Sequence, residues 1–411
     1  MSAFLIGAAT SAHQTEGNNV FSDCWAMEHM KHSSFIEPSG IAADHYHHFE
    51  EDIALLAEAG CNAYRFSVEW ARIEPEEGQF SEEAAAHYRA VAEACRRHGL
   101  EPVVTLHHFS SPVWLIQKGG WESDETPALF ARYARYISER LGKINYLSTI
   151  NEANMGEGIA RAVQAFSASL QVGVDAEAFR ARASEAAKEN REVFGTPSPA
   201  VFLGARTARG NEIIKQAHRM ARAAVREVLQ GCKVGLTLSL HDVQAQKGGE
   251  ALAAEEWQSE FCDWLPAVEG DDFIGVQNYT RKVFGKDGEL PPPEGAERTQ
   301  MGYEFYPEAL EHVVRRVWHE ARLPVLVTEN GVAAKDDARR CTFIERALKG
   351  VLRCKQELPI LGYLHWSLLD NFEWQKGFQM QFGLVSVDRD TMARTPKESL
   401  SVLGRINKEF I

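Results

Sequence analysis

The sequence lacks long apolar runs and blocks of positive charge. In its 411 residues no stretch approaches the ~20 apolar residues that a membrane-spanning helix needs, and the first residues lack the basic segment of a signal peptide. The net charge of −14 at pH 7 is spread along the chain. An acidic chain of this kind is a poor partner for nucleic acids or anionic membranes. We therefore expect a small neutral substrate, and neither nucleic acid nor membrane as a partner.

Paired cysteines and metal-ligand spacings are also missing. Seven cysteines, an odd number, are scattered from Cys24 to Cys354 without a CxxC pair. This pattern indicates reduced thiols and predicts a cytoplasmic protein. The histidine cluster Asp44–His48 matches no zinc motif and leads into an amphipathic helix over Glu50–Ala59. No glycine-rich phosphate loop follows the first predicted strand. The sequence therefore predicts neither a metal nor a cofactor.

What the chain does contain is an alternation of apolar, strand-like segments and amphipathic helical stretches. The predicted strands are Phe4–Thr10, Asn62–Val68, Pro102–Phe109, Tyr146–Asn151, Lys233–Leu240, Phe273–Tyr279, Pro324–Glu329 and Ile360–Trp366. Eight strands alternating with helices are typical of a parallel sheet closed into an α/β, (β/α)8 TIM barrel. We expect one such domain over residues 1–411. A doubly wound open sheet is the alternative.

Polar residues collect at the carboxyl ends of these predicted strands. They are Gln14 and Glu16, Arg65, His107 and His108, Asn151 and Glu152, His241, Gln277 to Tyr279, Glu329 and Trp366. In a barrel these ends meet at one rim, which is where the active sites of this fold lie. Two long segments, 153–232 and 281–302, follow the fourth and sixth strands, and we expect them to shape the entrance to the site. The second of these is predicted to be an irregular loop, and the sequence leaves the oligomeric state open.

Two glutamates stand at the ends of predicted strands in this pattern. Glu329 ends the run Val325–Glu329 just before the turn residues Asn330-Gly331, and Glu152 ends Ser148–Glu152. Two carboxylates ~5–5.5 Å apart are the machinery of a retaining glycosidase, one attacking the anomeric carbon and the other protonating the leaving oxygen. Arg65 could hold Glu329 ionised, whereas a drier setting near a second carboxylate would keep Glu152 protonated. The alternative is that one or both form surface ion pairs.

Five stretches carry a resemblance to a known family. They are Phe4–Gly17, Tyr64–Ile73, Thr149–Glu152, Thr328–Gly331 and Trp366–Trp374. In this order and at this spacing the sequence resembles glycoside hydrolase family 1, the retaining β-glucosidase and β-galactosidase family, over essentially its whole length. The resemblance implies a (β/α)8 barrel, in agreement with the strand count.

The resemblance also implies a role for each site residue. Glu329 is expected to be the nucleophile, Glu152 the acid/base, Arg65 and Tyr279 the groups that hold the nucleophile, and Asn151 the partner of the sugar 2-hydroxyl. The remaining expected substrate-binding residues are Gln14, His108, Glu373 and the Trp374 indole for hydroxyl groups and Trp366 as an apolar platform. Sugars offer hydroxyl edges and C–H faces, so charged acceptors, amides and aromatic rings suit them. The alternative for each is a structural role: core aromatics, a buried histidine or an ion-pair partner.

Four positions depart from the family pattern: Ile6, Phe109, Ala153 and Gln277. Gln277 stands where an asparagine is usual and is expected to support the acid/base. Glu373 stands where family members acting on 6-phosphorylated sugars usually carry serine, and a carboxylate there would repel a phosphate.

The sequence therefore predicts a retaining exo-β-glycosidase acting on unphosphorylated β-glycosides or oligosaccharides. Glucosides are the leading substrates, followed by galactosides and fucosides. A transglycosylase that uses the same covalent intermediate is the first alternative, and a non-catalytic sugar-binding relative is the second.

Overall fold

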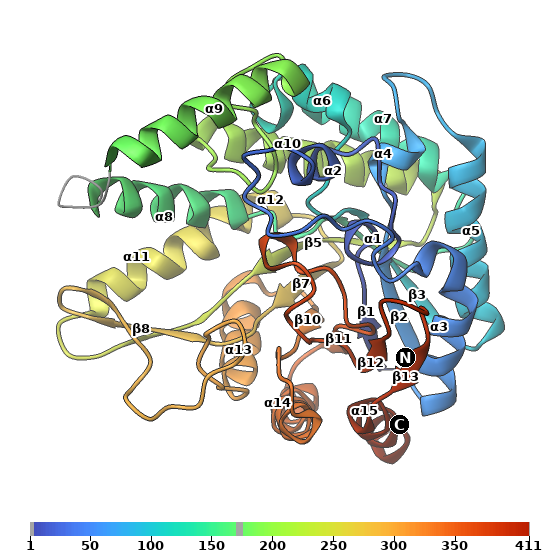
Figure 1. Ribbon diagram of the computed structural model, residues 1–411. Helices are drawn as coiled ribbons and strands as arrows, with labels where there is room; N and C mark the ends of the chain where they lie inside the picture. Colours follow the sequence, from blue (N-terminus) through green and yellow to red (C-terminus); the bar gives the residue numbers. More distant parts are fainter. Residues whose placement is uncertain (1–3, 170–175, 411) are drawn as a thin grey trace.

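A computed structural model describes residues 4–169 and 176–410 of the chain. Eight parallel strands close into a barrel in the order β1-β11-β10-β7-β5-β4-β3-β2. Figure 1 shows this barrel surrounded by helices. Their bounds are β1 Leu5–Ala9, β2 Ala63–Ser67, β3 Glu101–His107, β4 Tyr146–Ile150, β5 Lys233–Ser239, β7 Phe273–Gln277, β10 Val325–Asn330 and β11 Ile360–Trp366. Each predicted strand lies at its predicted place to within two residues at either end. The TIM-barrel prediction is confirmed.

The strands are buried on both faces, which explains why they read as continuous apolar runs. Every residue of β10 is buried, beginning with the β-branched and apolar run Val325-Leu326-Val327. The register places strand ends level with one another, since Ala9 pairs with Trp366 on one side and with Arg65 on the other. Side chains from distant parts of the sequence therefore meet at one end of the barrel.

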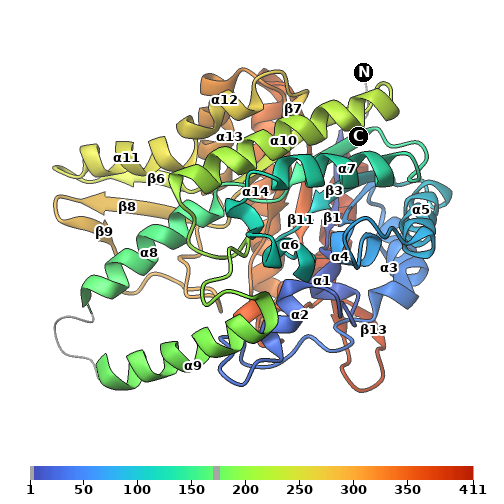
Figure 2. The same ribbon diagram turned by 90° about the horizontal axis from the view of Figure 1, so that it is seen from above.

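The outer helices surround the barrel (Figures 1 and 2), and the long ones bury apolar residues, such as Val91 and Ala92 of α5 and Val313, Val314 and Val317 of α13. α5 begins at a Ser81 cap whose side chain accepts a hydrogen bond from the Ala84 backbone N–H, and basic residues occupy its last turn. The outer helices are α3 His45–Ala59, α5 Glu82–Arg97, α7 Thr126–Ser138, α10 Ala208–Val228, α12 Leu265–Val268, α13 Ala309–Ala321, α14 Asp337–Glu357 and α15 Glu398–Phe410. The other helical elements are α1 Ala12–Thr15, α2 Asp23–Glu28, α4 Trp70–Ile73, α6 Val113–Gln117, η1 Gly120–Glu122, α8 Met155–Ser169, α9 Ala176–Phe194, α11 Glu250–Glu260, η3 Cys262–Trp264 and η4 Trp374–Lys376.

Segment 281–302 differs from the loop predicted for it. It contains β8 (Arg281–Gly285) and β9 (Gly288–Leu290), which pair antiparallel, and β8 also pairs parallel with β6 (Asp242–Ala245). This outer sheet, as we call β6, β8 and β9, projects from one side of the barrel beside α11 (Figure 2). The glycines and prolines of the segment obscured a short strand of Arg, Lys, Val and Phe. A second small sheet joins β12 (Val385–Val387) to β13 (Arg394–Pro396).

The helix predicted from Glu50 begins five residues earlier, at His45, so the histidine cluster forms its first turn. The His45 ring contacts the Asp52 carboxylate through Nδ1 at 2.8 Å and the Tyr64 hydroxyl through Nε2 at 2.9 Å. The cluster is therefore a structural anchor of α3. Among residues 4–169 and 176–410, no three His, Cys, Asp or Glu side chains are grouped so as to hold a metal ion.

All seven cysteines are free thiols. Within the described part of the chain, no helix combines the length and the apolar character needed to cross a membrane. Of the predicted rim segment 153–232, residues 170–175 lie outside the described residues, and the rest forms α8, α9 and α10 with a loop before α10.

Candidate active site

A cavity of about 560 Å³ opens at the carboxyl ends of the barrel strands. Eight of the ten predicted site residues line it: Gln14, His108, Glu152, Tyr279, Glu329, Trp366, Glu373 and Trp374. The other two, Arg65 and Asn151, are fully buried and contact the lining side chains from within the barrel. The structure thus brings all ten predicted residues together, from seven of the eight strand ends and the segments that follow them.

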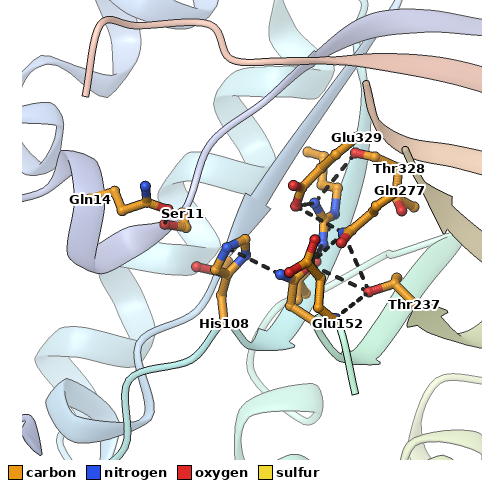
Figure 3. Close-up of polar contacts among 12 residues, drawn as sticks. Ser11, Gln14, His108, Glu152, Thr237, Gln277, Thr328 and Glu329 are labelled. Atoms are coloured by element: carbon orange, nitrogen blue, oxygen red, sulfur yellow. Dashed lines mark hydrogen bonds and ion pairs between the residues drawn. The ribbon is translucent and has the colours of Figure 1, made fainter. Parts of the chain in front are cut away.

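Glu329 is the penultimate residue of β10 and accepts hydrogen bonds from three side chains; Figure 3 shows it beside Gln277. Its Oε1 accepts from Arg65 Nη1 at 2.5 Å and from Gln277 Nε2 at 2.9 Å, and its Oε2 accepts from the Tyr279 hydroxyl at 2.7 Å. Burial raises the pKa of Glu329, and Arg65 and Tyr279 oppose that rise. Gly331 lets the chain turn here, because a Cβ on it would lie only 1.8 Å from the Trp366 carbonyl oxygen.

Arg65 and Gln277 join Glu329 to Asn151. Arg65 Nη2 donates to Asn151 Oδ1 at 2.6 Å, and Gln277 Nε2 donates to the same oxygen at 2.6 Å. Gln277 was expected to support the acid/base. The contacts of its amide nitrogen are to Glu329, Asn151 and the Thr237 hydroxyl.

Glu152 follows β4 with a left-handed backbone, φ 44°. A non-glycine residue rarely adopts this conformation, and such strain concentrates at functional sites. The Thr237 hydroxyl holds the Glu152 backbone N–H at 3.1 Å. Burial, followed by the nearby charge of Glu329, raises the pKa of the Glu152 carboxyl to about 8. Of the two carboxyl groups, Glu152 keeps its proton near neutral pH, because Glu329 alone has an arginine on its carboxylate.

The orientation of His108 follows from Asn151. Arg65, Gln277 and the Thr237 hydroxyl all donate to Asn151 Oδ1, so the Asn151 Nδ2 group faces His108 Nε2, 3.2 Å away, as a donor. His108 is therefore neutral with the proton on Nδ1, and burial together with Arg65 holds its pKa well below the usual range. Nδ1 is buried and has no hydrogen-bond partner in the described chain.

Gln14 and Glu373 form a second hydrogen-bonding corner of the cavity. Gln14 Nε2 donates to Glu373 Oε2 at 3.1 Å and to the Phe372 carbonyl at 2.9 Å, while Gln14 Oε1 accepts from the Ser11 hydroxyl at 2.7 Å. Figure 3 shows Gln14 and Ser11 across the site from Glu329. Burial raises the pKa of Glu373 to about 7.

Aromatic rings form the remaining wall. Trp366 stacks on His108 with ring centroids 5.5 Å apart, and Trp374 stacks on His13 at 5.5 Å with an interplanar angle of 5°. Phe109 packs against Trp374 at 5.3 Å. His107, in contrast, is buried behind the wall, with its Nε2 on the Ser111 hydroxyl at 3.0 Å, so its role is structural.

Sequence reasoning missed one supporting residue and several cavity residues. His13 is buried, stacks on Trp374 from behind and was not singled out, although it lies one residue before Gln14. Tyr303 lines the cavity and follows the segment 281–302 by one residue. Met155, Ile159 and Leu203 line it from segment 153–232. Of these three, Met155 lies near a recognised motif, three residues after Glu152.

The assembled geometry matches what comparison with known proteins shows. The sequence model of the family named Glycosyl hydrolase family 1 matches residues 1–179 and 271–409 of this chain. This chain belongs to glycosyl hydrolase family 1. It is a β-glucosidase-like glycoside hydrolase.

Three curated relatives in this family differ in the activity that they are named for. The chain is 29% identical to "Beta-glucosidase" of Agrobacterium sp., covering 96% of this chain and 92% of the relative. It is 28% identical to the "Bifunctional beta-D-glucosidase/beta-D-fucosidase" of Bifidobacterium breve, covering 96% and 95%. It is 26% identical to "6-phospho-beta-galactosidase 1" of Streptococcus pneumoniae, also covering 96% and 95%. Among solved structures, "beta-glycosidase BGL167" is 45% identical with a TM-score of 0.90, covering 99% of this chain and 96% of that one.

Proposed function

We propose that this family 1 glycosidase hydrolyses unphosphorylated β-glucosides with retention of configuration. The observation that carries the proposal is the unequal setting of its two carboxyl groups. Glu329 has Arg65, Tyr279 and Gln277 around its oxygens, whereas Glu152 has a pKa raised to about 8. One group is prepared to attack and the other to donate a proton, as double displacement requires.

In this mechanism Glu329 attacks the anomeric carbon while Glu152 protonates the departing glycosidic oxygen. The negative charge of Glu329 is lost when the ester forms. Because that charge helps to raise the pKa of Glu152, Glu152 becomes more acidic and can then remove a proton from the incoming water. Release of the sugar restores both groups to their starting states.

The corner formed by Gln14 and Glu373 supports exo-action on a neutral sugar. It offers an amide and a buried carboxyl group to hydroxyl groups at the closed end of the cavity. A 6-phosphate would meet the Glu373 carboxyl, which repels it once ionised. Among the described residues, Lys376 is the one lysine that lines the cavity. The comparison of phosphorylated and unphosphorylated sugars is therefore the decisive part of the test.

The test is hydrolysis of aryl β-glucoside, β-galactoside, β-fucoside and 6-phospho-β-glucoside, with the product anomer followed by NMR. We expect the β-anomer to appear first and the glucoside to have the highest kcat/KM. Activity should fall as pH rises through about 8, because Glu152 then loses the proton that it must donate. Selective cleavage of the 6-phosphoglucoside would contradict the substrate assignment. Transfer products at high acceptor concentration would favour a transglycosylase, and sugar binding without turnover would favour a binding protein.

A further inference from the structure

The turn that follows β4 and carries Glu152 is fixed on one side by β5. The Glu152 backbone N–H donates to the Thr237 hydroxyl at 3.1 Å, and the backbone N–H of Ala153 donates to the Thr237 carbonyl oxygen at 3.1 Å. Figure 3 shows Thr237 beside Glu152. The Asn154 side chain donates to the Ser239 carbonyl oxygen at 2.7 Å. Three consecutive residues of the turn are thus tied to two residues of β5.

The other side of this turn is held by Arg206, in the loop that leads into α10. Its Nη1 donates to the Ala153 carbonyl oxygen at 2.7 Å, and its Nη2 donates to the Phe202 carbonyl oxygen at 3.2 Å. The Arg206 backbone N–H donates to the Gly156 carbonyl oxygen at 3.1 Å, in the first turn of α8. One residue therefore joins the loop before α10 to the segment directly after Glu152.

Two helices carry glycines at the points where the Arg206 side chain packs against them. A Cβ on Gly156 in α8 would lie 2.7 Å from the Arg206 Cβ, Nε and Cζ atoms, and a Cβ on Gly210 in α10 would lie 2.5 Å from Arg206 Cγ. Glycine is less favourable than alanine inside a helix. Here the two glycines leave the space that the guanidinium group and its stem occupy.

Arg206 is a buried cation whose side-chain hydrogen bonds go to backbone carbonyl groups. Only 6% of its surface is exposed. Burial lowers the pKa of Arg206 to about 10, against the opposing charges of Glu122 and Glu157. Burying a charge is costly, and an apolar side chain of similar volume often fills such a position at no greater cost. What arginine adds here is the pair of hydrogen bonds to the Ala153 and Phe202 carbonyl oxygens.

Glu152 needs such support because its backbone is strained. Its φ is 44°, and a conformation of this kind persists only where neighbouring groups enforce it. A proton donor must also lie within hydrogen-bond reach of the oxygen that it protonates, and a misplacement of about 1 Å lowers rates by ~10²-fold. Loss of the Arg206 guanidinium would release the Ala153 carbonyl and let the neighbouring carboxyl group move.

We propose that Arg206 is a positioning residue for the acid/base group: by holding the Ala153 carbonyl, it keeps the Glu152 carboxyl within reach of the departing glycosidic oxygen. This inference rests on the proposed function, because it requires Glu152 to be the proton donor. Arg206 acts through the backbone of the turn and touches neither the sugar nor the reacting atoms.

The test compares two leaving groups in the Arg206→Met variant, which keeps a stem of similar length without donors. Dinitrophenolate departs as an anion without a proton, whereas phenolate needs one. We expect kcat/KM to fall about 10–100-fold on phenyl β-glucoside and less than about 3-fold on 2,4-dinitrophenyl β-glucoside, because general acid catalysis contributes ~10²–10⁴-fold only where a proton is required. A merely structural role would lower both values alike.

A matched control is Arg96→Met, at the opposite end of the barrel. Arg96 Nη1 also donates to a backbone carbonyl, that of Lys143, at 2.6 Å, but this bond lies before β4 begins. Arg96→Met should leave kcat/KM unchanged on both glucosides. Arg206→Lys keeps the charge but has a single nitrogen, which cannot hold both carbonyl groups in place. We expect it to show the same selective loss at about 3–10-fold, and it serves as the test variant if thermal unfolding shows that Arg206→Met does not fold.

Glu152→Ala separates this inference from the proposed function. If Glu152 is the proton donor, this variant loses far more activity on phenyl β-glucoside than on the dinitrophenyl substrate. With that selectivity present, equal losses on the two substrates in the folded Arg206 variants, or no loss on either, would overturn the inference and leave the proposed function intact. If Glu152→Ala lowered both values equally, the proposed function would fail, and Arg206 would have no acid to position.

Discussion

Two buried arginine–carboxylate pairs in this molecule, Arg394–Asp52 and Arg65–Glu329, differ in their contacts and in their location. In one, Arg394 donates to both oxygens of Asp52 at 2.8 and 3.1 Å, and His45 contacts the same carboxylate at 2.8 Å. In the other, Arg65 donates to a single oxygen of Glu329 at 2.5 Å. The first pair is sealed between α3 and β13, and the second borders the active-site cavity.

The pKa shifts of the two carboxyl groups have opposite signs. Both are raised by burial, but His45 and Arg394 together outweigh burial and lower the pKa of Asp52, whereas Arg65 and Tyr279 do not outweigh it for Glu329. A carboxylate with every oxygen occupied by cations is stabilised and inert. A carboxylate with one cation and an open cavity retains the reactivity that a nucleophile needs. The difference between the pairs can be tested by removing their members.

The largest expected effect comes from removing the proposed nucleophile. Glu329→Ala should lower kcat on aryl β-glucosides by ~10⁴-fold or more, because no oxygen remains to attack the anomeric carbon. Azide should restore turnover by entering the vacated space and attacking from the same side, giving the α-glycosyl azide. NMR identification of that product is the measurement. Residual activity with β-product and no rescue would contradict the role of Glu329.

Removing the arginine of the sealed pair should damage stability and spare catalysis. Arg394→Met leaves the buried Asp52 carboxylate with the His45 ring but without its arginine. Because a buried charge then lacks its ion-pair partner, we expect a loss of about 3–5 kcal/mol in the free energy of unfolding. Denaturant unfolding checks this value, and kcat/KM of the folded variant should match that of the unmodified enzyme. A loss below about 1 kcal/mol would show that this pair contributes no more than a surface ion pair.

Gln277 offers a finer test of how the active-site pair is held. Its amide donates to both Glu329 and Asn151, and a hydrogen bond to a charged group contributes about 1.5–3 kcal/mol. Gln277→Ala should therefore lower kcat/KM by roughly 10–100-fold, with the acid limb of the pH profile moved to higher pH, since Glu329 loses a donor. Gln277→Asn is the matched control for a shorter amide. An unchanged acid limb in Gln277→Ala would show that the amide only fills space.

The contrast between the pairs also shows what the sequence could and could not reveal. The strands and the site were predictable because buried apolar runs such as Val325–Val327 end in polar residues, and a barrel brings strand ends together. The sealed pair could not be predicted, because Asp52 and Arg394 are 342 positions apart and neither lies at the carboxyl end of a barrel strand. Tyr303 lines the cavity just after the outer sheet, outside every recognised motif. That sheet was missed because the turns and prolines around Arg281–Gly285 carry the stronger local signal.

The smallest expected effect concerns stability at pH 7, which Glu152→Gln should raise and Asp52→Asn should lower. The pKa of Asp52 is lowered in the folded chain, so its carboxylate stabilises the fold above its unfolded pKa, ~3.9, and that contribution is lost as pH falls through the lower folded value. The pKa of Glu152 is raised to about 8, so the folded chain retains a proton that the unfolded chain releases above ~4.3. The contribution of Glu152 to stability therefore declines as pH rises from ~4.3 to about 8.

Glu152→Gln removes this titration, and we expect the variant to be more stable than the unmodified enzyme at pH 7, by on the order of 1–2 kcal/mol, and no different at pH 4. Asp52→Asn should be less stable than the unmodified enzyme at pH 7, because Arg394 and His45 lose their anionic partner. Thermal unfolding of the three proteins between pH 4 and pH 8 measures both differences. If Glu152→Gln were destabilising across this range, the Glu152 carboxyl would be ionised and well paired in the folded chain, and it could not act as the resting acid. The proposed division of labour with Glu329 therefore depends on the sign of this small difference in stability.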